Sequence, residues 1–330
     1  MRHAFSLSRA IACVLALVAA AVASMLPIAA TAQSYPVKPV KIVQGFAAGG
    51  NADTIARLVA AGLAVELGQS FVVEGRTGAG GNIASEYVAK SPADGYTLVL
   101  QTAGHTVSAA MYKSLPFDPL KDFSWISLIS TFPFVIGTSV DNKITNIKDL
   151  IQTAKRSPGT LSFSSVGVGT TQHLTGELLQ SSAGITMVHV PYRGGGTPVQ
   201  DVIAGRVDLL FDSITVSRPQ IEGGKLRALA VTSAARVPQL PDVPPAAETV
   251  PGFEVTSWAA LAGPPGLPPE VLARLHGALV KVIAKPDISK RLVDIGGTPV
   301  SSTPEETSKH VAREIEKWKR VVEQARIPRQ

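Results

Sequence analysis

Strand and helix patterns alternate along this chain, and the alternation limits its fold more than any other feature. Residues 40–46 form an apolar run typical of a buried strand, and residues 53–67 carry apolar side chains at helical spacing. Further strands are predicted at 71–74 and 96–101, with a helix between them at 81–90. This order of elements predicts a parallel sheet with right-handed crossovers.

The same alternation resumes after residue 145 and predicts a second open α/β unit of similar size. Asn146 is suited to cap the start of a helix, and Gly184 is suited to end one. The predicted helices are 146–156, a segment that ends near 182, and 198–204, and the predicted strands are 161–165, 187–190, 207–211 and 226–232.

Two extended apolar stretches, residues 125–140 and 255–263, are predicted to cross between the units. Two helices are expected after the second crossing. The first covers 269–284, and the second begins at a capping box formed by Thr303 and Glu306. The predicted limits are 33–130 plus 255–330 for a discontinuous domain I, and 131–254 for domain II.

The first residues are typical of a secretory signal peptide, residues 1–32. Arg2 and Arg9 make its start basic, and residues 11–26 are apolar and uncharged. An Ala-Thr-Ala sequence then supplies a cleavage site after Ala32. We therefore expect export to the periplasm, with a mature chain that begins at Gln33.

Composition excludes several classes of function. The one cysteine, Cys13, lies in the leader, so the mature chain offers no disulfide, thiolate metal site or thiol nucleophile. The formal net charge is +6, without a run of Lys and Arg, which speaks against nucleic-acid binding. No histidines stand at metal-ligand spacing. We expect no metal and no cofactor.

The first strand leads into a glycine-rich turn that opens a helix, at Gly49, Gly50 and Asn51. Unpaired N–H groups and the helix dipole favour an anion at such a turn, and adjacent glycines let a ligand approach the backbone. For the loop backbone we therefore expect ligand contact. For Asp53, the residues themselves favour a role at the helix start, with an ion pair to Arg57.

A similar turn, residues 164–171, follows a strand of the second unit. It matches neither a P-loop nor a dinucleotide fingerprint. Two N–H-rich turns, one in each unit, predict an anion site between the units. Elsewhere, Gly78–Gly81 is expected to be a tight packing turn. Further candidates for ligand contact are His105, after a strand end, His173, in the opening turn of a helix, and Arg193, in a glycine-rich loop.

Taken in order, several motifs resemble the substrate-binding proteins of tripartite tricarboxylate transporters, also called the Bordetella uptake gene (Bug) family. The resemblance covers essentially the whole mature chain. It rests on Tyr35–Val40, Phe46–Asp53, Gly78–Asn82, Asp94–Leu98, His189–Gly195, Gly224–Ala230 and Pro241–Pro244.

The resemblance implies an α/β fold of the two-domain periplasmic-binding-protein (Venus flytrap) kind, type II-like, with the ligand in the interdomain cleft. Beside Gly49 and Arg193, it implies ligand contact for Phe46, Gly50, Asn51, Asp53, Thr102, Ala103, His105, Ser165, Gly167, Thr170, Tyr192 and Asp212. The chain departs from the family pattern at Ala47, Ala48, Asn51, Gly75 and Arg193. These departures bear on which ligand is bound.

The expected function is capture of a small carboxylate and its delivery to the membrane permease subunits of a tripartite transporter. The protein would act as a monomer and perform no chemistry. An extracytoplasmic carboxylate sensor, which presents its closed form to a signalling receptor, is an alternative. An exported enzyme is another, although the sequence supplies no recognisable catalytic set.

Overall fold

The structure, a computed structural model, describes residues 35–330. The predicted leader and its cleavage site lie outside the described residues. Within the described part of the chain, no helix has both the length and the apolar character needed to cross a membrane.

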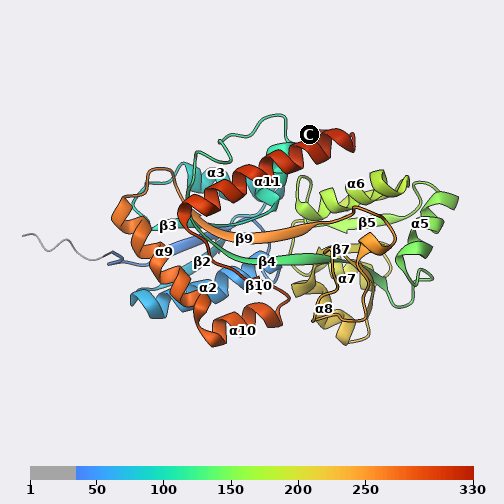
Figure 1. Cartoon of the computed structure of the whole chain (residues 1–330), viewed down its shortest axis with the longest axis horizontal. Helices are drawn as coiled ribbons and strands as arrows, with labels where there is room; N and C mark the ends of the chain where they lie inside the picture. The colour runs from blue at the N-terminus through green and yellow to red at the C-terminus, as the bar shows by residue number, and fades with distance from the viewer. Residues whose placement is uncertain (1–34) are drawn as a thin grey trace, which may run out of the picture. The chain divides into compact units, whose positions relative to one another are not determined.

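The described strands form a mixed sheet in the order β2-β1-β3-β9-β4-β7-β5-β6, with β8 and β10 also paired to β4 (Figure 1). Strand β1 pairs in parallel with β2 and β3, and β5 pairs in parallel with β6 and β7, as the alternation predicts. The strands are β1 (Val40–Gln44), β2 (Phe71–Gly75), β3 (Thr97–Thr102), β4 (Ser124–Ser139), β5 (Ser162–Ser165), β6 (Val188–Pro191), β7 (Leu209–Ser213), β8 (Leu226–Val231), β9 (Thr256–Gly263) and β10 (Thr298–Pro299).

Helices cover the sheet, and most of them lie on segments close to those predicted from the sequence. They are α2 (Asn51–Leu67), α3 (Asn82–Ala89), α4 (Gly104–Met111), α5 (Ile147–Arg156), α6 (Thr171–Ala183), α7 (Thr197–Ile203), α8 (Ile214–Glu222), α9 (Pro269–Ala284), α10 (Pro286–Asp294) and α11 (Pro304–Gln324), with single 3₁₀ turns η1 (Ala79–Gly81) and η2 (Ala246–Glu248).

Strand β4 joins two halves of the sheet. Residues 124–133 pair with the antiparallel strand β9, and residues 134–139 pair with β7 and β8. We call lobe I the half with β1–β3, β9, β10, residues 124–133, α2–α4 and α9–α11. Lobe II is the half with residues 134–139, β5–β8 and α5–α8. Figure 1 shows β4 and β9 side by side between the lobes.

Both predicted crossings are therefore strands of the sheet, and they pair with each other. The two lobes belong to one compact unit, residues 38–330. The domain limits expected at 130/131 and 254/255 stay a prediction.

Several helix ends lie where capping chemistry places them. Helix α2 stops at Gly68, which adopts a left-handed φ of 68° that favours glycine. The capping box of Thr303 and Glu306 is present at the start of α11. That helix buries Val311, Ile315, Trp318 and Val322, the stripe that its periodicity predicts.

Three helices were missed by sequence reasoning. The expectation of two helices after the second crossing is wrong, because α9, α10 and α11 all follow it. Helix α10 begins one residue after α9 ends, and an extended Lys285 (ψ 131°) separates them. Helix α8 contains Pro219, and Ala103, the N-cap of α4, has no capping side chain, so neither helix gives a clear local signal.

Candidate ligand-binding site

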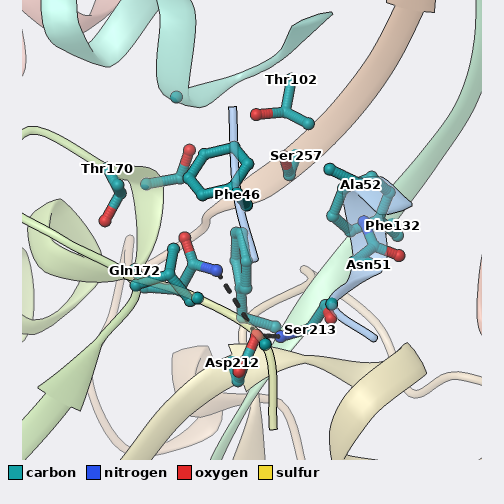
Figure 2. A pocket seen from close by; sticks show the side chains of 17 residues that line it. Phe46, Asn51, Ala52, Thr102, Phe132, Thr170, Gln172, Asp212, Ser213 and Ser257 are labelled. Carbon is teal, nitrogen blue, oxygen red and sulfur yellow. Dashed lines mark hydrogen bonds between the residues drawn. The ribbon is translucent and has the colours of Figure 1, made fainter. Parts of the chain in front are cut away.

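A buried cavity lies between the lobes, at the ends of strands and the starts of helices (Figure 2). Lobe I lines it with Phe46, Gly50, Asn51, Ala52, Thr102, Gly104, Phe132 and Ser257. Lobe II lines it with Phe134, Val166, Thr170, Thr171, Gln172, Gly194, Gly195, Asp212 and Ser213. Three phenylalanines thus provide apolar surface, while hydroxyls, amides and one carboxyl provide polar groups.

Four helices begin at the wall of this cavity: α2, α4, α6 and α8. The first N–H groups of a helix have no partner inside it, and the helix dipole places partial positive charge there. In the described chain, the N-caps of α2, α4 and α8 are Gly50, Ala103 and Ser213, and none caps through its side chain. These helix ends leave N–H groups for an anion.

The charged side chains do not supply that positive potential. None of the described residues that line the cavity is Lys, Arg or His. An anion placed here would therefore meet backbone N–H groups and hydroxyls such as those of Thr102, Ser213 and Ser257. The Ser213 hydroxyl is buried and has no hydrogen-bond partner among residues 35–330, so it is open to a ligand.

Among the described residues of the cavity wall, Asp212 carries the one ionisable side chain. It lies at the end of β7, and only 2% of its surface is exposed. Its Oδ1 accepts a hydrogen bond from the Ser213 N–H at 2.7 Å and one from the Gln172 amide at 3.4 Å, both dashed in Figure 2. Burial raises the pKa of this carboxyl to about 6, and these hydrogen bonds moderate the rise.

The lobes are in contact around the cavity, which defines a closed conformation. On one side the Ala47 N–H donates to the Arg193 carbonyl at 3.1 Å, in a bridge between Ala47 and Gly194. On another, the Ser108 hydroxyl donates to the Gly169 carbonyl at 3.2 Å. Separating the lobes would break these contacts and open the cavity.

Asn51 also links the lobes. Its side-chain amide lies 2.6 Å from the Thr215 hydroxyl of α8, and that hydroxyl donates to the Ile295 carbonyl at 2.7 Å. A hydroxyl has one hydrogen to donate, so both contacts are satisfied when the Asn51 NH₂ group faces Thr215. The Asn51 side chain therefore fastens the closed form, and its neighbouring backbone faces the cavity.

Of the residues predicted for ligand contact, six line the cavity: Phe46, Gly50, Asn51, Thr102, Thr170 and Asp212. Asp53 does not. Its Oδ2 accepts from the Gly49 N–H at 3.1 Å and from Arg57 Nε at 2.9 Å. The expected Asp53–Arg57 pair is thus present, and it orders the turn that carries Gly49 and Gly50.

His105 is buried and does not line the cavity, but it lines a small neighbouring pocket together with Phe46 and Thr102, and Ala103 is fully buried. The ring contacts the Pro119 carbonyl through Nε2 at 2.7 Å and the Ser85 hydroxyl through Nδ1 at 3.4 Å. Burial lowers the pKa of His105 to about 4, so the ring is neutral near pH 7 and donates from Nε2. This residue braces the β3–α4 turn.

The remaining candidates lie at the turn of lobe II and at the outer side of the cleft. The Ser165 hydroxyl accepts from the Gly167 N–H at 3.1 Å and contacts His189 Nε2 at 2.6 Å, which holds the β5–α6 turn. Gly167, Tyr192 and Arg193 line a separate open hollow of about 540 Å³. The Tyr192 hydroxyl there donates to Asp201 at 2.6 Å.

Sequence reasoning missed much of the wall. Phe132 and Phe134 lie on β4 and Ser257 lies on β9, the segments interpreted only as crossings. Gln172 and Ser213 stand directly beside predicted positions, at helix starts. Two adjacent polar residues, Thr256 and Ser257, at the start of an otherwise apolar strand are the signal that could have identified the crossing strands as part of the site.

Two lobes that share crossing strands and close over a buried cavity define the class of periplasmic binding proteins, which capture a solute and catalyse no reaction. The family model "Tripartite tricarboxylate transporter family receptor" matches residues 55–327. The chain therefore belongs to this family of transporter receptors, and the predicted membership and two-domain α/β fold are confirmed.

Curated relatives agree. The UPF0065 protein in the tcbD-tcbE intergenic region of Pseudomonas sp. (strain P51) is 38% identical over 296 residues, covering 89% of this chain and 88% of the relative. Protein BugT of Bordetella pertussis is 34% identical over 295 residues, covering 88% of this chain and 90% of BugT.

Solved structures share the fold at high similarity. Rpa4515 of R. palustris, solved with adipate, has a TM-score of 0.87 at 36% identity and covers 90% of this chain and 100% of its own. The periplasmic binding protein BugD has a TM-score of 0.87 at 34% identity, with coverages of 90% and 100%. MatC of Rhodopseudomonas palustris, solved with malate, has a TM-score of 0.84 at 31% identity, with coverages of 87% and 100%. These relatives are solute-binding proteins, and this chain is one as well, not an enzyme.

Proposed function

We propose that this protein captures a small organic acid in the cavity between its lobes and delivers it to the membrane permease subunits of a tripartite transporter. The observation that carries the proposal is the meeting of four helix N-termini at one cavity, where no Lys, Arg or His stands among the described lining residues. Such a site suits a carboxylate. Adipate and malate in the structures of two relatives support the same ligand class.

Capture follows from closure. Helices α2 and α4 present N–H groups from lobe I, and α6 and α8 present them from lobe II. Only the closed form brings both sets to one ligand, so a bound acid shifts the equilibrium towards closure. The permease would then distinguish the loaded, closed protein from the open one.

A thermal-shift screen of organic acids tests the ligand class. An acid present at 100 times its Kd is expected to stabilise the folded protein by about 2.7 kcal/mol, and the melting temperature rises accordingly. The matched amides, such as succinamide beside succinate, serve as controls because they keep the size and lack the charge. Stabilisation by the amides equal to that by the acids would contradict a carboxylate site.

Export is tested on the protein itself. The Ala-Thr-Ala site predicts that periplasmic protein begins at Gln33. N-terminal sequencing of the periplasmic fraction, or its intact mass, measures this directly. A chain that retains residues before 30, or one that carries lipid on Cys13, would show that the leader is processed in another way.

A further inference from the structure

One polar atom of the cavity is left unexplained by the binding of a single carboxylate. The Asp212 carboxyl is held through Oδ1, by the Ser213 N–H at 2.7 Å and by Gln172 at 3.4 Å. Its Oδ2 is buried and has no hydrogen-bond partner among the described residues. Leaving a buried polar atom unpaired is costly, so the site is incomplete without a partner for this oxygen.

The surroundings of Asp212 supply no counter-ion. Strands β4 and β5, which flank β7, carry no titratable side chain. The other nearby elements carry groups that are neutral or engaged elsewhere: His173 and Glu177 on α6, His189 on β6, Asp201 on α7, Arg218 and Glu222 on α8, and Asp53 and Arg57 on α2 across the cavity.

The partners of these groups are visible in the structure. Arg57 pairs with Asp53, Arg218 pairs with Glu222, and Asp201 binds Tyr192 and Arg206. Burial lowers the pKa of His173 to about 4 and that of His189 to about 3, so both rings are neutral near pH 7. A negative charge on Asp212 would therefore stand alone beside an anionic ligand and repel it.

We propose that Asp212 recognises a second carboxyl group on the ligand, with one proton shared between the two carboxyl groups. The inference rests on the proposed function and names its substrate class, a short dicarboxylic acid. One carboxylate lies at the helix N-termini. The other accepts a hydrogen bond from the protonated Asp212 Oδ2. No group is transferred. Where one of the two carboxyl groups is protonated beforehand, it supplies the shared proton, and where both are ionised, the proton comes from solvent.

The size of the cavity limits the length of the acid. In the closed form, the space open to the centre of a water-sized sphere is about 40 Å³. One water needs about 10–15 Å³ by this measure, so the space holds roughly three waters in contact. A short chain such as succinate fits this space better than a long one.

Proton sharing fixes the direction of the pH dependence. The complex retains a proton that free Asp212 loses as the pH rises through about 6. Affinity for a dicarboxylate is therefore expected to change little between pH 5.5 and pH 6 and to fall up to tenfold per pH unit above pH 6. Between pH 6 and pH 8 the loss reaches ten- to hundredfold. An ammonium ligand would show the opposite trend, because ionised Asp212 attracts it.

Calorimetry on the full mature protein at pH 5.5, 6, 7 and 8 tests this. The probes form matched sets of equal chain length: succinate, glutarate and adipate, the corresponding monocarboxylates butyrate, pentanoate and hexanoate, and the amino acids β-alanine, 4-aminobutyrate and 5-aminopentanoate. Repeating the titrations in buffers of different ionisation enthalpy gives the number of protons that the complex takes up for each ligand bound. At pH 8, one of the dicarboxylates is expected to take up close to one proton and the monocarboxylates none.

Asp212→Asn provides the matched variant. Its NH₂ group replaces Oδ2 as a permanent donor, while its oxygen keeps the contacts with Ser213 and Gln172. Dicarboxylate affinity should then be independent of pH and should exceed that of the wild type at pH 8. Asp208→Asn, next to Ser162 at the opposite end of β7, is the control and should behave as wild type. Circular dichroism checks that both variants fold. The number of protons taken up on binding is measured on the wild-type protein, so this part of the test does not depend on any variant.

The outcomes separate this inference from the proposed function. Monocarboxylates that bind as tightly as the dicarboxylates, without pH dependence, would overturn the role of Asp212 and leave the carboxylate site intact. Preference for the amino acids, or dicarboxylate affinity that rises with pH, would overturn it in favour of an ionised Asp212. Binding of none of the acids would overturn the proposed function and this inference with it.

Discussion

Gly50→Pro is expected to weaken acid binding by roughly ten- to hundredfold. Gly50 caps α2 and lines the cavity, and its φ of −80° is one that proline adopts. The helix start should therefore survive, while one N–H donor to the carboxylate is lost. A hydrogen bond to a charged group contributes about 1.5–3 kcal/mol, which corresponds to this loss of affinity.

Gly50→Ala is the matched control. A Cβ at Gly50 would lie 3.4 Å from the Gly195 nitrogen and 3.5 Å from the Ala47 carbonyl, both ordinary contact distances. The alanine variant keeps the N–H and should bind close to wild type. Calorimetry measures both, with circular dichroism as a check of folding. If Gly50→Pro folds and binds an acid normally, the carboxylate is held elsewhere, and Arg193 becomes the next candidate.

Gly80→Ala should weaken binding by obstructing closure, although Gly80 does not touch the cavity. It lies in the turn η1 of lobe I, and a Cβ there would be 2.7 Å from the Val168 carbonyl of lobe II. The open form has no such clash. Overpacking costs about 1–3 kcal/mol, and here it destabilises only the closed form. The Kd should therefore rise about five- to hundredfold.

The strain of alanine at a left-handed φ must be separated from the clash. Gly68 has a φ of 68°, close to the 66° of Gly80, and a Cβ at Gly68 meets nothing within 4 Å. Gly68→Ala therefore carries the same backbone strain without the contact between lobes. It should lose stability and keep its affinity. Small-angle scattering with saturating acid gives a second readout, and equal compaction of Gly80→Ala and wild type would contradict the obstruction.

The sequence predicted local structure well where the cause was local. The helix stop at Gly68, the capping box at Thr303 and the inward stripe of α11 depend on residues within a few positions of each other, and all are present. The predicted helix 269–284 matches α9, but the short helix α10 that follows the extended Lys285 was missed.

The site was only partly predictable, because its residues meet through long-range contacts. Strand ends and helix starts identified the turns of Gly50 and Thr170 as candidates, and the family resemblance added Asp212. They could not show that β4 and β9 also line the cavity, since Phe132 and Ser257 look like core positions of apolar strands. Which face of a buried strand meets a cavity depends on packing and not on local pattern.

The sequence by itself determined the family, the α/β class and the presence of N–H-rich turns, because these depend on motif order, periodicity and glycine chemistry. Only the tertiary structure decided what each polar side chain does. Asn51 reaches Thr215 across the lobes, and Asp53 turns to Arg57. Asp212 keeps one buried oxygen free for a ligand. These roles depend on contacts between the two lobes in the closed form. The residues on either side of each position in the sequence do not determine such long-range contacts.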